Sequence, residues 1–251
     1  MRSENSVAKK ERDLDDYLTH LYVHANEIEH FTLFSGISVQ LFLKFANLSS
    51  LLLLKHRYED ASFNIHTQMD FIGENQFGHF LKESSEKPTS LCFLDFSDER
   101  RLNLLTPQEQ AELLYIAHKK EAFRSPFYHH LQNRFVYLTD EDEHITKIYF
   151  RDIEDFYGLI ADLFNQVIKE KTKSTAFWRK KNNIILPELS SATVERYTDF
   201  YEDGVLMSLF RVDKTNYGIE IRCLPENIFP DEVLEDIKHH VKRPYDFLIE
   251  I

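Results

Sequence analysis

The sequence predicts an α+β fold in which amphipathic helices pack on a mainly antiparallel sheet built from hairpins and a meander. Pairs of short runs rich in β-branched and aromatic residues are separated by polar turns, a pattern typical of antiparallel hairpins. Segments with apolar residues at spacings of three and four follow these pairs and indicate helices. Aromatic residues make up 14% of the 251 residues and fall mostly at core-period positions, so we expect a bulky interior.

Changes in composition divide the chain into predicted parts. Residues 1–10 are predicted to form a disordered tail, and residues 11–173 a main α+β domain. The basic stretch 174–190 is predicted to be a linker. Residues 191–251 repeat the plan of hairpin and helix and are predicted to form a smaller α+β unit, either separate or part of one continuous domain.

Composition argues against several classes of protein. The formal net charge of −12 repels phosphate backbones, which argues against broad binding to duplex DNA. No two of the six glycines lie close enough for a dinucleotide fingerprint or a Walker loop. The sequence also lacks a serine elbow, a paired-cysteine zinc spacing and a calcium loop. We therefore expect no cofactor.

Cysteine usage and hydropathy indicate the cytosol. Cys92 and Cys223 each lie in an apolar strand-like run, as expected for reduced core thiols. The first residues lack the apolar stretch of a signal peptide. The most apolar region, 39–54, is interrupted by polar residues and is too short for a membrane span. We expect a cytosolic protein with no membrane partner, and the sequence leaves the oligomeric state open.

The first predicted element is a helix over residues 13–30, although residues 19–23 also alternate as a strand would. Apolar residues that recur at helical spacing predict it: Leu14, Leu18, Leu21, Ala25 and Ile28.

One flank of this helix carries a candidate metal site. Asp16, His20, His24 and Glu27 would stand at spacings of four, four and three, which is how helical ligands converge on one metal ion. A solvated polar flank explains the same residues and is the favoured interpretation.

A predicted meander and a central strand follow. Three strand-like runs at 39–45, 51–58 and 62–71 are joined by polar turns. A short helix is predicted at 74–82. The strand predicted at 90–96 is apolar nearly throughout, which places it in the centre of the sheet.

Acidic residues gather at the end of this central strand. Asp95, Asp98 and Glu99 are a candidate magnesium site, because clustered carboxylates suit that ion. Arg100 and Arg101 lie beside them and are placed to neutralise them, which is the favoured interpretation.

Proline marks the next two helix starts. Thr106-Pro107-Gln108-Glu109 combines a capping threonine, a proline at the first helical position and a glutamate that can reach back, and predicts a helix to about residue 120. Ser125-Pro126 predicts a short helical turn through residue 131.

A hairpin and a long helix form the most clearly patterned part of the chain. Residues 134–138 and 145–150 predict paired strands across the acidic turn 140–143. Asp152 then offers a cap to a helix predicted at 152–173, with acids in its first turn and lysines in its last.

The C-terminal part predicts a similar series. Its elements are, in order, a helix at 192–202, strands at 205–212 and 217–224, a helix at 230–241 and a final strand at 245–251. Gly204 ends the first of these helices, and prolines bracket the second.

The segment 169–181 holds six basic residues against the single acid Glu170. Cations beside exposed aromatic residues pair with phosphate and stack on bases, so a single-strand nucleic-acid site is one interpretation of this local basic patch. A helix end followed by a solvated linker is the favoured one. The candidate partner-binding residues are Trp178, Arg179, Lys180 and Lys181.

One hairpin carries a pattern associated with catalysis. Asp213 and the run Glu220-Ile221-Arg222 resemble the layout of metal-dependent nucleases of the PD-(D/E)xK type, in which two acids hold magnesium and a lysine assists the attacking water. The resemblance covers this hairpin alone. Arg222 stands in place of the lysine, and arginine stays protonated, so it cannot act as a general base. Alternating charges on a solvent-facing side of a strand explain the same residues and are favoured.

The sequence thus predicts a non-enzymatic cytosolic protein that binds another macromolecule, with a protein as the expected partner. The alternatives are a metal-dependent hydrolase or nuclease and a binder of single-stranded nucleic acid through residues 169–181.

Overall fold

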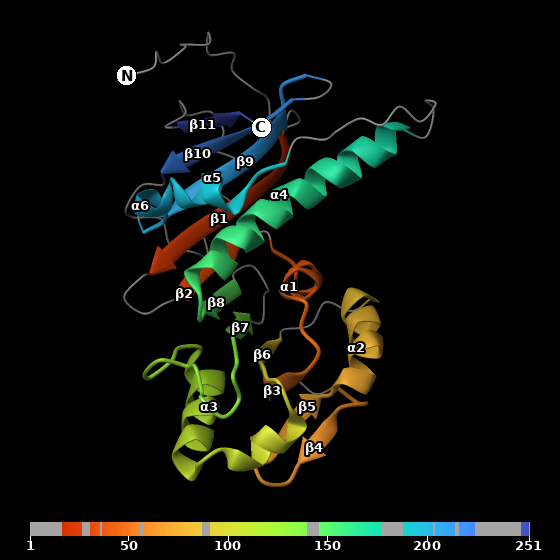
Figure 1. The fold of residues 1–251 in the computed structure, drawn as a ribbon, viewed down its shortest axis with the longest axis vertical. Helices are drawn as coiled ribbons and strands as arrows, with labels where there is room; N and C mark the ends of the chain where they lie inside the picture. The colour runs from red at the N-terminus through yellow and green to blue at the C-terminus, as the bar shows by residue number, and fades with distance from the viewer. Residues whose placement is uncertain are drawn as a thin grey trace.

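The computed structural model has the predicted α+β fold, with helices packed on an antiparallel sheet (Figure 1). It describes residues 17–26, 31–35, 37–55, 58–86, 91–139, 146–176, 188–202, 204–213, 216–223 and 247–250.

The described strands form one sheet in the order β11-β10-β9-β1-β2-β8-β7-β6-β3-β5-β4, and the neighbours pair antiparallel. β1 lies inside the sheet between β9 and β2, so strands from both ends of the chain meet there. The strands are β1 (Tyr17–Asn26), β2 (Phe31–Ser35), β3 (Leu51–Lys55), β4 (Ser62–Asn64), β5 (Met69–Ile72), β6 (Cys92–Asp95), β7 (Phe135–Thr139), β8 (Thr146–Phe150), β9 (Val205–Arg211), β10 (Tyr217–Cys223) and β11 (Phe247–Glu250).

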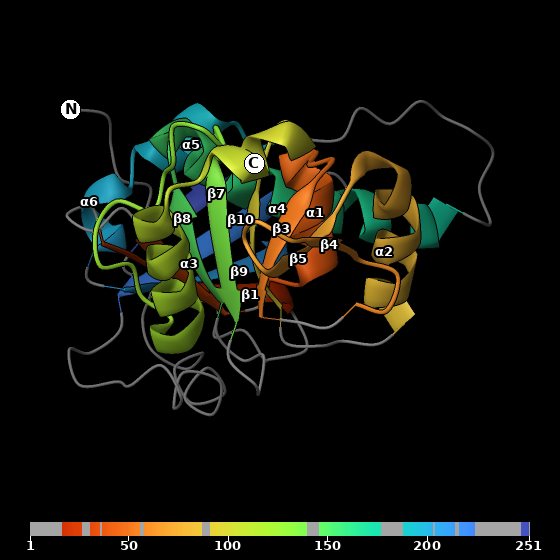
Figure 2. The ribbon, with the colours of Figure 1, turned by 90° about the horizontal axis from the view of Figure 1, so that it is seen from below.

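Helices cover both faces of the sheet. One face packs against α1, α2, α4, α5 and α6, as Phe42, Phe80 and Phe156 illustrate. The other packs against α3 and the 3₁₀ helix η2 through Leu113 and Leu102. Figure 2 shows α3 and α2 on opposite sides of β7 and β3. The helices are α1 (Val39–Ala46), α2 (Glu74–Glu86), η2 (Glu99–Leu104), α3 (Pro107–Lys119), α4 (Ile153–Ala176), α5 (Ser191–Glu195) and α6 (Thr198–Tyr201).

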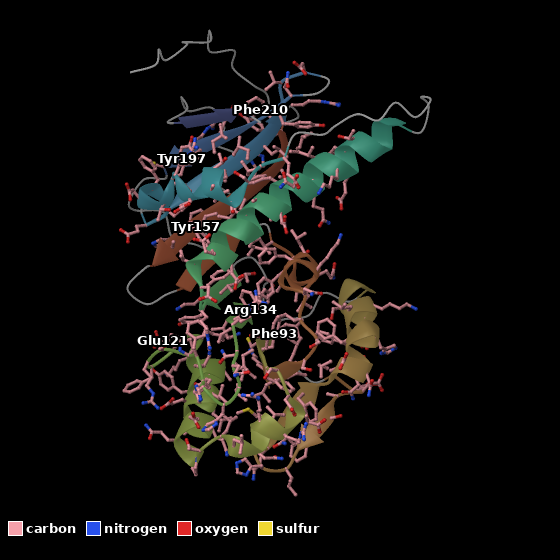
Figure 3. All side chains as sticks on the ribbon, in the orientation of Figure 1. Phe93, Glu121, Arg134, Tyr157, Tyr197 and Phe210 are labelled. Carbon is pink, nitrogen blue, oxygen red and sulfur yellow. The ribbon has the colours of Figure 1, made fainter. Side chains whose placement is uncertain are left out.

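Aromatic rings fill the interior, as predicted. Phe93 of β6, labelled in Figure 3, stacks on Tyr137 of β7 with ring centroids 4.8 Å apart and planes 10° from parallel. The Phe42 ring of α1 packs against both rings, with its centroid 6.2 Å from that of Phe93 and 5.0 Å from that of Tyr137. Such contacts add to the hydrophobic effect of burying the rings.

The helix predicted at 13–30 is wrong, because residues 17–26 form β1. Leu21, Val23 and Ala25 are buried at every second position. Leu18, Leu21 and Ala25 also fit helical spacing, but only an extended chain can hydrogen-bond to β2 on one side and β9 on the other. Pairing in the sheet therefore overrode the helical pattern.

The strand predicted at 39–45 is also wrong, because this segment is helix α1. The Ser38 hydroxyl accepts a hydrogen bond from the Leu41 amide at the helix start, and Asn47 ends the helix with a φ of 48°. Phe42, Leu43 and Ala46 are buried at helical spacing. The predicted meander therefore lacks its first strand.

The single strand predicted at 62–71 is instead a hairpin of β4 and β5. The Asn64 side chain accepts from the Thr67 amide at 2.8 Å, and Gln68 takes a φ of 57°. These features turn the chain between the strands and leave β4 at the edge of the sheet.

Two helix predictions need smaller corrections. Residues 125–131 form loop and turn instead of a helical turn. The Asn133 side chain accepts from the Tyr128 amide and donates to the Pro126 carbonyl, and so holds this loop. The helix predicted at 192–202 is divided into α5 and α6.

Other predicted elements are confirmed. The hairpin of β7 and β8 leads into α4, and β9 and β10 form the second hairpin. β6 is buried throughout and lies between β3 and β7. Thr106 and Glu109 form both hydrogen bonds of the predicted capping box at α3. The helix after residue 73 and the last strand are present as α2 and β11.

Several predictions fall outside the described residues. These are the tail 1–10, the turn 140–143, most of the linker 174–190 and the helix 230–241. The domain boundary within 174–190 stays a prediction. Among the described helices, none combines the length and apolar character needed to cross a membrane.

Candidate functional site

The predicted partner-binding residues Trp178, Arg179, Lys180 and Lys181 lie outside the described residues, so that site stays a prediction. The described start of the basic segment is exposed. The Lys169 ammonium lies 3.8 Å from the Glu188 carboxylate, with both side chains more than half exposed. A pair of this kind contributes little to stability.

Strands β1, β9 and β10 bring together residues that the sequence placed in two unrelated candidate sites. His20 on β1 is opposite Ser208 on β9, which is opposite Glu220 on β10. Residues opposite one another in an antiparallel sheet share a face. With Tyr17 and Arg222, these residues form what we call the buried polar network.

Glu220 and Arg222 form a buried ion pair within this network. The Arg222 Nη2 atom donates to Glu220 Oε2 at 2.8 Å, and the Tyr17 hydroxyl donates to the same oxygen at 2.6 Å. The Glu220 side chain is fully buried, and Arg222 is 3% exposed. The interpretation of these charges as solvent-facing is therefore wrong. A magnesium ion at Glu220 would have to compete with the guanidinium that already binds its carboxylate.

His20 extends the network to β9. Its Nδ1 atom lies 2.9 Å from the Ser208 hydroxyl, and its ring centroid lies 5.3 Å from that of Tyr17. Burial, and after it the positive charge of Arg222, lower the pKa of His20. A serine beside a neutral histidine is the pairing of an activated nucleophile. Ser208, however, is only 1% exposed, so its hydroxyl is not accessible to a substrate.

The helical metal site, which was the less favoured interpretation, would need a helix that residues 17–26 do not form. In a strand, His20 and His24 are separated by about 13 Å of rise, too far to share one ion. Asp16 and Glu27 lie outside the described residues. Within the described part of the chain, no group of three or more His, Cys, Asp or Glu side chains is placed to hold a metal.

Asp213 does not join Glu220. Its carboxylate accepts hydrogen bonds from the backbone and side-chain amides of Asn216, at 2.9 and 2.7 Å, and both residues are exposed. The side chain thus stabilises the turn, whereas Glu220 points into the buried polar network.

Two of the candidate magnesium ligands, Asp95 and Asp98, have separate structural roles. Asp95 Oδ1 accepts from the amides of Arg134 and Phe135, at 2.9 and 2.8 Å, and ties β6 to the start of β7. Burial raises the pKa of Asp95 to about 6, because desolvation outweighs these hydrogen bonds. This carboxylate is anchored in the interior.

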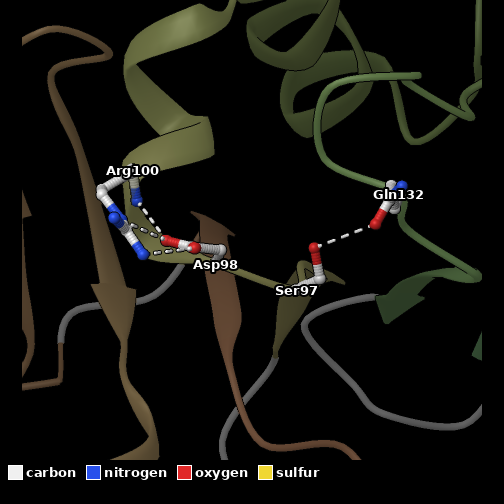
Figure 4. A network of polar contacts seen from close by, with 4 residues as sticks. All are labelled: Ser97, Asp98, Arg100 and Gln132. Atoms are coloured by element: carbon white, nitrogen blue, oxygen red, sulfur yellow. Dashed lines mark hydrogen bonds and ion pairs between the residues drawn. The ribbon is translucent and has the colours of Figure 1, made fainter.

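Asp98 has a different role, at the start of η2. It accepts from the Arg100 amide at 2.9 Å and pairs with the Arg100 guanidinium at 3.2 Å (Figure 4). The backbone hydrogen bond first, and then the bond from the Arg100 side chain, lower the pKa of Asp98. Arg101 donates to the His130 carbonyl instead. Arg100 therefore neutralises Asp98 as predicted, whereas Arg101 makes no hydrogen bond to it and lowers its pKa only through its charge, the smallest of the causes.

A pocket of about 560 Å³ opens where β3 begins and where β5 and β6 end; we call it the strand-end pocket. The first turn of α2 forms one wall. Its lining residues are Ser50, Ser62, Phe71, Gly73, Glu74, Asn75, Gln76, Phe96, Ser97, Asp98 and Glu99. Three of these are acidic, and none is lysine or arginine.

Large apolar side chains are exposed on the edge strand β4, in the turn that follows it and at the end of η2. Phe63 is 62% exposed, Ile65 86% and Leu104 55%; we call these three the β4 edge surface. The Asn64 side-chain amide donates to the side-chain oxygen of Asn103 at 3.0 Å, which holds the turn after β4 against η2. Sequence reasoning missed this surface because it placed residues 62–71 in one strand. The sequence feature that could have predicted the hairpin is the pair Asn64 and Thr67, which hydrogen-bond to each other across the turn.

Comparison with models of known protein families, with curated proteins and with solved structures found no match to this chain.

Proposed function

We propose that the protein binds another protein through the β4 edge surface and catalyses no reaction itself. The exposure of Phe63 on the edge strand β4, of Ile65 in the turn after it and of Leu104 at the end of η2, which Asn64 and Asn103 hold against that turn, carries this proposal. Exposed apolar side chains grouped on a surface are typical of interaction sites, whereas single ones scattered over it are ordinary. Burying Phe63 or Ile65 in a partner would contribute about 1.5–3 kcal/mol each.

The interactions of two buried acids argue against a catalytic role for them. Glu220 is held by Arg222 and Tyr17, and Asp95 by two backbone amides. A catalytic acid or base needs a proton that it can exchange with substrate. Groups held inside the fold in this way are not available to exchange a proton with a substrate.

The two alternatives rest on weaker grounds. Neither the metal-dependent hydrolase or nuclease nor the single-strand nucleic-acid binder has a comparable supporting contact among the described residues. The residues proposed for nucleic-acid binding, around Trp178, lie outside them.

Site-specific photo-crosslinking tests the proposal. A photoreactive phenylalanine analogue replaces Phe63 or, as a matched control, Leu114 on α3, which is similarly exposed at 58%. In cells that express the protein, we expect one partner to crosslink from position 63 and not from position 114. With that partner purified, Phe63→Ser should weaken binding about tenfold or more, and Leu114→Ser should leave it unchanged. Equal crosslinking from both positions would refute the proposal.

A further inference from the structure

We propose that the partner presents an extended segment carrying a lysine or arginine, which lies along β4 and places its cation in the strand-end pocket. This inference rests on the proposed function and specifies the chemistry of the partner.

The edge position of β4 favours an extended partner segment. β4 is the last strand in the order, and among the described strands it pairs with β5 alone, with Phe63 opposite Asp70. Edge strands commonly carry charges that prevent further pairing. Here Phe63, in the middle of β4, is exposed instead, and so is Ile65 in the turn that follows the strand. A segment that adds to such an edge gains main-chain hydrogen bonds together with contacts to alternate side chains.

The length of β4 limits what pairing alone can contribute. The strand has three residues, so an added segment would form few main-chain hydrogen bonds. Stable binding therefore requires side-chain anchors. Phe63 and Ile65 supply apolar contacts, and the strand-end pocket supplies a site for a polar one.

The strand-end pocket lies where a segment along β4 would meet it. Ser62 is the first residue of β4 and also lines the pocket. Gln76 on α2 holds this junction, since its Nε2 atom donates to the Ser62 hydroxyl at 3.2 Å and its Oε1 atom accepts from the Gly73 amide at 3.0 Å. The junction between strand and pocket is thus hydrogen-bonded before any partner binds.

The charge of the pocket selects a cation. Glu74, Asp98 and Glu99 line it. Arg100 offsets Asp98, whereas Glu74 and Glu99 are exposed and form no ion pair with another residue in the described part of the chain. The net charge of −12 further favours a basic partner by steering its approach.

Selection of peptides on the full chain tests this inference. A phage-displayed library of random linear 12-residue peptides is selected on the immobilised protein, and enriched peptides are synthesised with a fluorophore. Their dissociation constants are measured by anisotropy at low and high salt. The variants are Phe63→Ser, the pair Glu74→Gln with Glu99→Gln, and a matched control pair, Glu195→Gln with Glu202→Gln, which removes two exposed charges elsewhere.

We expect the peptides to share a lysine or arginine next to apolar residues. The Glu74/Glu99 variant should weaken their binding about fivefold, added salt should weaken it further, and the control pair should change nothing. Two results would overturn the inference and leave the proposed function intact. Either the peptides whose binding depends on Phe63 share no lysine or arginine, or their binding is the same in the Glu74/Glu99 variant. If no selected peptide depends on Phe63, both fail.

Discussion

The Glu220–Arg222 pair places two charges in a part of the sheet where both side chains are almost entirely withdrawn from water. Desolvating such a pair costs several kcal/mol per ion, and mutual attraction offsets this only with good geometry and further hydrogen bonds. The Tyr17 hydroxyl provides one, donating to Glu220 and accepting from Arg222 at 3.1 Å. The pair therefore contributes little to the free energy of unfolding, but removing only one of its two partners should be strongly destabilising.

Replacing Arg222 with methionine should destabilise the protein strongly. Glu220 would keep its buried charge and lose the guanidinium that offsets it, which costs about 3–5 kcal/mol in other buried pairs. The double variant Glu220→Gln with Arg222→Met removes both charges and keeps an acceptor for Tyr17. It should recover most of the loss. Urea unfolding at pH 7 measures the free energy of unfolding of the single and the double variant. If the two variants were equally unstable, this account would be contradicted.

Sequence reasoning identified Glu220 and Arg222 but assigned them to the wrong environment. It assumed that a strand with alternating charges has one side in water. Tyr217 to Arg222 are buried at every position, so β10 has no water-facing side along that stretch. Nor could sequence spacing link Tyr17 to Glu220, because their contact exists only through the pairing of β1 with β9 and of β9 with β10.

At the level of elements, the hairpin of β9 and β10 depends on a close contact between a glycine and a ring. Gly218 lies opposite Phe210, and a Cβ atom added to Gly218 would stand 2.3 Å from the Phe210 ring. Phe210, labelled in Figure 3, is fully buried and meets the Tyr17 ring edge-on at 6.2 Å. The ring has little freedom to move away, because interiors are closely packed.

Gly218→Ala should therefore destabilise the protein by about 1–3 kcal/mol, as overpacking does in other cores. Gly78→Ala is the matched control. Gly78 lies in α2 with nothing within 4 Å of an added Cβ, so alanine there should stabilise by up to about 1 kcal/mol through helix propensity. Thermal or urea unfolding distinguishes the two. If Gly218→Ala left the free energy of unfolding unchanged, the Phe210 ring would be able to shift without cost.

The elements that could be predicted are those whose local signals agree with their tertiary environment. Thr106 and Glu109 cap α3 wherever that helix packs, because a capping box is complete within four residues. β1 and α1 are different. The apolar residues of both segments fit either period, and pairing with β9 or packing against α4 decides between them. Those partners are remote in sequence, so local pattern alone could not select the right structure.

On the scale of the whole molecule, β1 joins the two predicted parts of the chain. It pairs with β2 from the N-terminal part on one side and with β9 from the C-terminal part on the other. The apolar cluster that contains Val23 and Leu21 also contains Met207 and Ile221. Separating residues 191–251 would therefore expose one edge of β1 and part of the main core.

This continuity predicts that β9 and β10 unfold together with the rest of the sheet. A separable unit would melt at its own urea concentration, whereas strands that share a core and a ladder with β1 should lose structure in one cooperative transition. Hydrogen exchange pulses during a urea titration, read by mass spectrometry on peptides from β9, β1 and β6, measure the three midpoints. We expect them to coincide. If β9 instead unfolded at a lower urea concentration while β1 and β6 stayed protected, the C-terminal part would be an independent unit. In that case β1 would tolerate an open edge, and the buried polar network would contribute little to holding the sheet together.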